Sequence, residues 1–168
     1  GGIELMAGAR RRAGKRKHEL RFMPEFYPHI TAIKMQPGMN HEMVDLICGA
    51  RSDIGLIIET YGSGAVPKKL VDVISRHVQR GFPVYLSSSC GESGISDTMQ
   101  GHDEDAIAAY QAGVRNVRDM STSAATVKLM HVIGNNPNAD LETVEEEMIG
   151  KSYAGEITLP AAQRKEAY

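Results

Sequence analysis

The sequence has no tryptophan, only two cysteines, and aromatic side chains at 5% of its 168 residues. This scarcity argues against aromatic cages and base-stacking platforms, both of which need several exposed rings. Two cysteines are too few for a disulfide scaffold, so a reducing compartment, the cytoplasm, is the default. No apolar run approaches the roughly 18 residues that a membrane helix needs. We therefore expect a cytoplasmic domain without a membrane partner.

The composition that is present is typical of a globular protein. Hydrophobic residues make up 42% of the chain and charged residues 24%, so wholesale disorder is excluded. The length predicts one domain with short extensions.

Charge is distributed unevenly along the chain. Residues 1–21 carry seven basic and two acidic side chains, a net charge of +5, so the remainder carries −7 of the total of −2. The basic residues could contact phosphates, and a nucleic-acid role is one interpretation; a solvated linker is the other. The candidate residues of this cluster are Arg10, Arg11, Arg12, Lys15, Arg16 and Lys17.

From residue 30 onward, apolar runs typical of strands alternate with segments of helical periodicity. Strands are predicted at about 30–35, 54–59, 83–88 and 114–118. Helices are predicted at 41–50, 68–81, 103–113 and 121–134, with a last acidic helix that starts at Leu141 and runs into a tail. This alternation predicts an α/β fold of three layers, with an approximately four-stranded parallel sheet and helices on both faces.

Ligands of such sheets bind in the loops after the strands. The segment 61–66 (YGSGAV) is one such loop, and its backbone amides could hold an anion. It lacks the Gly-Lys-Ser/Thr of a P-loop and the third glycine of the dinucleotide fingerprint. A plain tight turn is the alternative interpretation.

A second loop follows the third predicted strand. Its sequence, SSSCGESG from Ser87, is one residue short of a nucleophile elbow. Cys90 could act as a thiolate if His77, His102 or His131 approached it; otherwise it is an inert buried cysteine. The carboxylates Asp97, Asp103, Glu104 and Asp105 could bind a cation, or could simply form a solvated helix start. No His/Cys pair has metal-ligand spacing, so neither a metal nor a cofactor is expected.

Six segments in order resemble the C-terminal domain of the asparaginase family, in particular bacterial type I asparaginases and the D subunit of the archaeal tRNA-dependent amidotransferase. Residues 54–67 resemble an apolar strand with a Y-G-x-G-N-x-P turn, and residues 83–94 a strand ending in T/S-Q-C-x-x-G. Residues 119–134 resemble the helix D-M-T-x-E-A-x-x-K-L, and residues 148–158 the closing segment with G-E-hydrophobic-T. Residues 8–28 are similar to the last N-domain strand and linker, and residues 34–39 to the K-hydrophobic-x-P-G-M strand end.

The resemblance implies an amide hydrolase whose nucleophilic Thr/Lys domain is missing from this chain. We therefore expect an asparaginase/glutaminase-type C-terminal domain that is inactive alone, has no catalytic residue of its own, and supplies dimer contacts and substrate loops. The substrate-binding residues it implies are Tyr61, Gly62, Ser63, Gly64, Ala65, Ser89 and Cys90. Ala65 and Ser89 replace the family's Asn and Gln, and Ala offers no side-chain hydrogen bond.

The expected organisation is a basic segment and interdomain linker at 1–29, the α/β domain at 30–160 and a tail at 161–168. The expected partners are the missing catalytic domain, a second copy in a homodimer or homotetramer, and an amino-acid amide as the substrate of the parent enzyme. Two alternatives stay open: a domain that binds tRNA or a partner protein through the basic cluster, and a regulatory domain that senses an amino acid.

Overall fold

Four parallel strands form the centre of the protein. The computed structural model describes residues 22–50, 55–62, 64–89 and 104–160. The strands are β1 (Ile30–Lys34), β2 (Gly55–Thr60), β3 (Val84–Ser88) and β4 (Arg115–Asn116), and they are hydrogen-bonded in the order β1-β2-β3-β4. The predicted four-stranded parallel sheet is confirmed.

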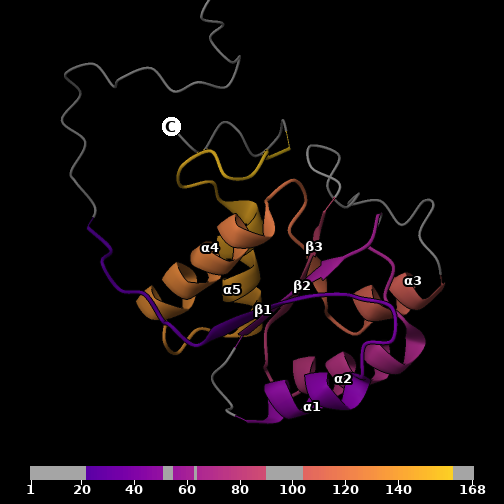
Figure 1. Cartoon of the computed structure of the whole chain (residues 1–168). Coiled ribbons are helices and arrows are strands. Elements are labelled where there is room, and N and C mark those ends of the chain that lie inside the picture. The colour runs from indigo at the N-terminus through magenta and orange to yellow at the C-terminus, as the bar shows by residue number, and fades with distance from the viewer. Residues whose placement is uncertain (1–21, 51–54, 63, 90–103, 161–168) are drawn as a thin grey trace, which may run out of the picture.

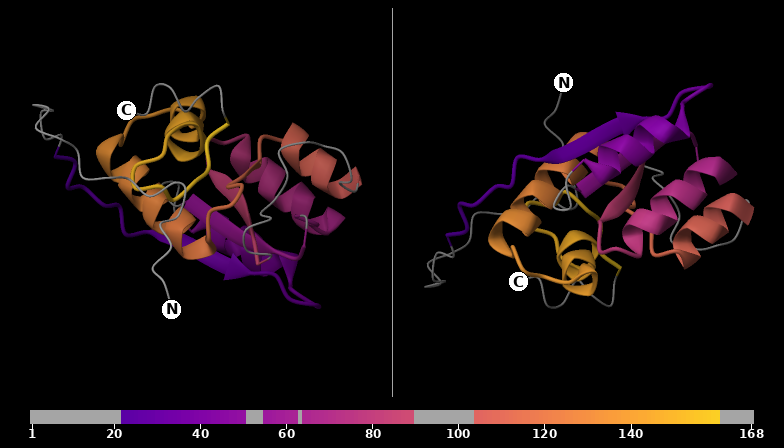
Figure 2. Two further views of the ribbon diagram at one scale, coloured as in Figure 1. Left: turned by 90° about the horizontal axis from the view of Figure 1, so that it is seen from above. Right: turned by 90° about the horizontal axis from the view of Figure 1, so that it is seen from below.

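Helices cover both faces of this sheet, as predicted (Figure 1 and Figure 2). The strand order advances in one direction, so right-handed crossovers place α1 (His41–Gly49), α2 (Lys68–Val78) and α3 (Glu104–Gln111) on one face. The other face is covered by α4 (Thr122–Asn135), α5 (Leu141–Glu145) and a π-helical turn, η2 (Glu146–Gly150). None of the helices in the described part of the chain is long and apolar enough to cross a membrane.

The continuous apolar run of β2 explains its central position. Leu56 and Ile58 are buried in the cluster beneath α1, α2 and α3, whereas Ile57 is buried in the cluster beneath α4 and α5. Successive side chains of a strand point to opposite faces, so a strand covered on both faces must be apolar at nearly every position.

Helix starts follow the capping pattern of the sequence. Asn40 accepts a hydrogen bond from the amide of Glu42, and Ser121 accepts one from the amide of Ala124. Both side chains satisfy amides that have no partner within the helix. The two caps fix where α1 and α4 begin relative to the strands before them.

The fourth strand and the last helix differ most from the prediction. The fourth strand has two residues rather than five, because the chain turns away at Arg118, whose φ is +55°. The last helix does not continue into the tail: α5 passes into η2, which ends at Gly150. Residues 151–159, called the strap below, then lie along α4 without regular structure, and Ile157 and Leu159 are buried in the cluster beneath α4.

Candidate functional site

Polar side chains gather where the strands end. Lys34 closes β1, Glu59 and Thr60 close β2, and Ser87 and Ser88 close β3. The register pairs Lys34 with Glu59 and Glu59 with Ser87, so these residues lie side by side at the carboxyl edge of the sheet. This is the edge at which parallel sheets bind ligands.

Glu59 connects three elements at this edge. Its Oε1 lies 2.8 Å from Lys34 Nζ, and its Oε2 accepts a 2.8 Å hydrogen bond from Thr122 Oγ1 at the start of α4. The Thr122 hydroxyl also lies 3.0 Å from Ser87 Oγ. The hydrogen bonds from Lys34 and then Thr122 lower the pKa of Glu59 and keep its carboxylate charged. Glu59 therefore ties β1 and the N-terminus of α4 to the centre of the sheet.

The loop after β2, called the turn loop below, consists of residues 61–65. Its ends meet in a bridge between Tyr61 and Ala65, and the amide of Gly64 donates to the Tyr61 carbonyl at 3.1 Å. Gly62 and Gly64 have φ angles of +48° and +102°, which favour glycine because a Cβ would crowd the backbone. The glycines are required by the turn itself.

Strand β3 holds the turn loop in place. Ser88 Oγ donates to the carbonyl of Gly62 at 2.7 Å, and Thr60 Oγ1 donates to the carbonyl of Ser87 at 3.0 Å. Both hydroxyls are on buried residues. The Ser88 hydroxyl thus holds the loop directly, and Thr60 joins the end of β2, from which the loop leaves, to β3. Binding loops need a rigid support of this kind.

A cleft of about 570 Å³ opens beside the turn loop. It lies between the loop after β1 and the turn loop, and Asp105 of α3 contributes to its wall. Its polar lining includes His41, Tyr61, Lys68 and Lys69. Among the described residues that line it, none is Ser, Thr or Cys. The cleft can hold a small polar molecule, but its described lining offers no serine, threonine or cysteine as a nucleophile.

The predicted site residues fall into three groups. Tyr61, Gly62, Gly64 and Ala65 share the turn loop, and Tyr61 and Ala65 line the cleft. Ser89 is exposed directly after β3 and is not among the described residues that line the cleft. The remaining predicted residues lie outside the described part of the chain: Ser63, Cys90, Arg10, Arg11, Arg12, Lys15, Arg16 and Lys17.

Two of the histidines considered as partners of Cys90 lie in the described part of the chain, and both contact other side chains. His77 Nε2 lies 2.7 Å from Asp45 Oδ1, where α1 packs on α2. The His131 ring packs between Phe26 and Tyr153, with centroid distances of 5.3 and 5.1 Å. Both therefore have structural partners, whereas His102 and Cys90 lie outside the described residues.

The other cysteine and the acidic cluster show no reactive or metal-binding arrangement. Cys48 is buried in α1, and burial raises the pKa of its thiol to about 12, so this thiol is unreactive at neutral pH. Glu104 and Asp105 lie in the first turn of α3, whereas Asp97 and Asp103 are not described. In the described ranges no three His, Cys, Asp or Glu side chains are grouped so that they could hold a metal ion.

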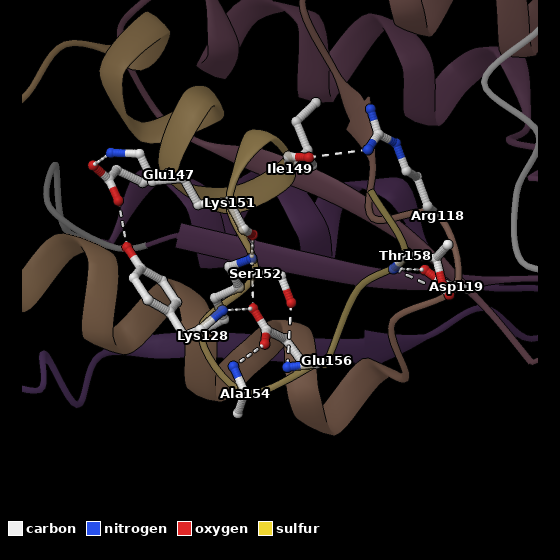
Figure 3. A network of polar contacts seen from close by, with 12 residues as sticks. Arg118, Asp119, Lys128, Glu147, Ile149, Lys151, Ser152, Ala154, Glu156 and Thr158 are labelled. Carbon is white, nitrogen blue, oxygen red and sulfur yellow. Dashed lines mark hydrogen bonds and ion pairs between the residues drawn. The ribbon is translucent and has the colours of Figure 1, made fainter. Parts of the chain in front are cut away.

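Two motifs that are far apart in the sequence, residues 119–134 and residues 148–158, contact each other where the strap lies on α4 (Figure 3). Lys128 of α4 pairs with Glu156 at 2.8 Å, and Asp119 accepts a 2.9 Å hydrogen bond from the amide of Thr158. Burial alone raises the pKa of Glu156, but the Lys128 ammonium and the amides of Ala154 and Tyr153 lower it to about 2. Burial lowers the pKa of Lys128, and Glu156 opposes that shift. The motif that begins at Asp119 and the closing motif are therefore structural partners.

The network at the sheet edge was not predicted from the sequence. Lys34, Glu59 and Ser88 each stand at the end of an apolar strand, and a charged or hydroxyl residue at that position was the available signal. Thr122 is separated from Glu59 by 63 positions, so no spacing rule connects them.

Comparisons with known proteins agree with this fold. The family model of the glutaminase/asparaginase C-terminal domain matches residues 29–148. An L-asparaginase of Thermococcus kodakarensis is 31% identical over 140 residues, which cover 82% of this chain and 40% of that protein. The D subunit of the glutamyl-tRNA(Gln) amidotransferase of Pyrococcus abyssi is 33% identical over 131 residues, which cover 77% of this chain and 28% of that protein.

Solved structures show the same likeness. The thermostable L-asparaginase of Thermococcus kodakarensis superposes with a TM-score of 0.75 and 29% identity over 90% of this chain and 44% of that one. L-asparaginase I of Vibrio cholerae gives a TM-score of 0.72 and 26% identity over 87% of this chain and 42% of that one. This chain thus corresponds to less than half the length of these relatives. By its sequence and its fold, the chain belongs to the glutaminase/asparaginase C-terminal domain family.

Proposed function

We propose that this chain is the substrate-loop half of an asparaginase/glutaminase-type amide hydrolase and is inactive alone. In this proposal residues 1–29 are a basic linker, residues 30–160 are the α/β domain and residues 161–168 are a tail. The nucleophile comes from a companion catalytic domain, and the turn loop grips the ammonium and carboxylate of an amino-acid amide. The protein acts in the cytoplasm as a homodimer or homotetramer.

The construction of the turn loop carries this proposal. The Ser88 hydroxyl holds it at the carboxyl edge of the sheet, and it borders a cleft whose described lining contains no serine, threonine or cysteine. A rigid loop beside such a cleft is suited to binding rather than to nucleophilic attack. The relatives support the chemistry, because one is named an L-asparaginase and another is named as part of a tRNA amidotransferase.

A hydrolysis assay tests the proposal. The chain alone is expected to release no ammonia from L-asparagine or L-glutamine. Mixed with the remaining part of the Thermococcus kodakarensis L-asparaginase as a separate polypeptide, it is expected to give activity. Turnover by the chain alone contradicts the proposal, and so does a mixture in which the companion is folded but inactive.

A pair of serine variants tests whether the turn loop contributes to the activity of the mixture. Ser88→Ala removes the hydroxyl that holds Gly62 and is expected to lower the activity of the mixture about tenfold, because loosely held contacts lose catalytic efficiency. Ser75→Ala removes a hydroxyl that bonds within α2 and serves as the control. Equal activities of the two variants contradict a role for the turn loop.

A second candidate is recognition of tRNA through Arg10–Lys17. The observation in its favour is the similarity to relatives named as D subunits of a glutamyl-tRNA(Gln) amidotransferase. A tRNA titration at several salt concentrations tests it, because each neutralised phosphate releases counterions. Salt-dependent affinity that R11E and K15E weaken supports this candidate, and a slope near zero rejects it.

A further inference from the structure

The side chain of Glu59 breaks the apolar pattern of β2. Leu56, Ile57 and Ile58 before it are fully buried, because helices cover both faces of this strand. Glu59 lies on the same face as Ile57, toward α4, with 19% of its side-chain surface exposed. Proteins keep such departures from a local pattern mainly at functional sites. Glu59 is therefore a candidate for a role beyond packing.

The hydrogen bonds at Glu59 have a fixed direction. Its carboxylate can only accept, so the Thr122 hydroxyl donates its one proton to Glu59 Oε2, at 2.8 Å. The same Thr122 oxygen lies 3.0 Å from Ser87 Oγ, which must then be the donor of that bond. Lys34 Nζ, 2.8 Å from Glu59 Oε1, stabilises the charged carboxylate. The charge on Glu59 thus orients both hydroxyl groups.

This chain of hydrogen bonds reaches the turn loop and the loop after β3. Ser87 and Ser88 are the last residues of β3, and their side chains point to opposite sides of the strand. Ser87 Oγ contacts Thr122 of α4, whereas Ser88 Oγ donates to the carbonyl of Gly62 in the turn loop. The next residue, Ser89, begins the loop after β3. A shift of Ser87 therefore moves the support of the turn loop and the start of the following loop together.

We propose that Glu59, acting through Thr122, is a positioning residue for the loops after β2 and β3. The inference rests on the function proposed above, in which the turn loop holds the ammonium and carboxylate of an amino-acid amide. Neither group changes when the amide bond is cleaved, so a less firmly held loop weakens binding of the substrate and of the transition state equally. Such a loss raises KM and leaves kcat unchanged.

Thr122→Val tests the inference, with Thr126→Val as the matched control. Both variants replace a hydroxyl of α4 by a methyl group, but Thr126 Oγ1 donates to the Thr122 carbonyl within the helix. In the mixture with the companion part of the Thermococcus kodakarensis L-asparaginase, T122V is expected to raise the KM for L-asparagine about tenfold and to keep kcat within about twofold of the parent value. T126V is expected to change neither constant. A lower kcat at an unchanged KM in T122V indicates a loss of folded protein and overturns the inference.

Glu59→Gln tests the link between Glu59 and Thr122. The Gln oxygen can still accept from Thr122, but its amide group then faces the ammonium of Lys34, and both of these groups are donors. E59Q is expected to raise KM. The double variant E59Q/T122V is expected to raise KM no further than T122V alone, because both changes break the same chain of hydrogen bonds. Increases in KM that multiply in the double variant show that Glu59 acts by another route and overturn the inference.

NMR spectra of the chain alone separate this inference from the proposed function. T122V and E59Q are expected to shift the amide resonances of Gly62, Gly64 and Ser89, whereas T126V is expected to leave them in place. Circular dichroism spectra that match the parent chain show that each variant is folded. Unchanged resonances in T122V overturn the inference even if the mixture is active. If the parent chain gives no ammonia with a folded companion, the proposed function fails, and the resonances alone then decide whether Glu59 positions the two loops.

Discussion

At Ala65 the turn loop presents only a methyl group to the cleft. The residue is exposed and lines the cleft, so a longer side chain can enter the cleft without disturbing the core. The resemblance to the asparaginase family implies an Asn here, with one donor and one acceptor group. Within the turn loop, Ala65 is thus the residue that departs from the family's Y-G-x-G-N-x-P pattern.

Replacing Ala65 is expected to strengthen ligand binding. Ala65→Asn adds a hydrogen-bonding group worth about 0.5–1.5 kcal/mol, so L-aspartate should bind roughly two- to tenfold more tightly. NMR titration of the chain with L-aspartate measures the change. Gly49→Asn, at the end of α1 with open space around it, is the control. Equal affinities in A65N and the parent chain contradict a ligand-binding role for this position.

At the scale of elements, the ion pair of Lys128 with Glu156 is one of the contacts that hold the strap against α4. Glu156 has a pKa of about 2 in the folded protein, against an ordinary value of 4.5. Between these values the unfolded chain binds more protons, so protonation favours unfolding. The contribution of Glu156 to stability is therefore fully present above about pH 5 and is lost as the pH falls toward 2.

Glu156→Gln is expected to remove this pH dependence. The parent chain should lose about 2 kcal/mol of unfolding free energy through this group between pH 5 and pH 2, after allowance for solvent screening. The variant should lose less over that range but should be less stable at neutral pH, because Lys128 stays buried without its carboxylate. Urea denaturation at several pH values measures both effects. If the unfolding free energy depends on pH in the same way in E156Q and in the parent chain, the ion pair in the strap does not contribute to stability. Glu142→Gln, on α5, is the control.

The segment before β1 is held against α4 by close backbone contact. The amide of Tyr27 donates to the carbonyl of Met130 at 2.9 Å, and Asn135 Nδ2 donates to the carbonyl of Glu25 at 2.8 Å. A Cβ on Gly134 would lie 2.8 Å from the backbone of Glu25. Gly134 therefore lets the segment before β1 lie directly against α4.

Gly134→Ala is expected to destabilise the protein by about 1–3 kcal/mol, despite alanine's higher helix propensity, because the backbone of Glu25 must move. Gly49→Ala, where a Cβ has no neighbour within 4 Å, is expected to be neutral or to stabilise by up to about 1 kcal/mol. Thermal denaturation compares the two variants. If G134A is as stable as G49A, the close approach of the chain to α4 is not needed for stability.

At the scale of the whole molecule, the two clusters of buried side chains share one sheet. Leu86 of β3 belongs to the cluster beneath α1–α3, and Leu129 of α4 belongs to the cluster on the other face. Ile57 and Ile58 are neighbours in β2, yet each is buried in a different one of the two clusters. Neither face can lose its helices without exposing the strands, so we expect the domain to unfold as one unit.

Leu129→Ala and Leu86→Ala are each expected to cost about 2–5 kcal/mol, because both side chains are fully buried. Each variant should still unfold in a single transition. Urea denaturation followed by far-ultraviolet circular dichroism and by tyrosine fluorescence measures this. Two separated transitions in L129A contradict the view that the two faces are one cooperative unit.

Periodicity along the chain determined the order of elements. The apolar run 54–59 predicted a strand covered on both faces, and the alternation of such runs with amphipathic segments predicted parallel pairing. The ends of elements were less predictable. The acidic segment after Leu141 reads as a continuous helix, yet it ends in a π-turn at Gly150, where Arg118 Nη1 donates to the carbonyl of Ile149.

Only the tertiary structure decided which distant residues meet. Nothing local to Glu59 indicates that Thr122 bonds to it, and nothing local to Lys128 indicates that Glu156 neutralises it. Side-chain periodicity records how one segment packs against an interior, and it extends over a few residues. The turn loop and the cleft instead lie where separate segments converge, and that convergence depends on the crossovers and packing of the whole chain.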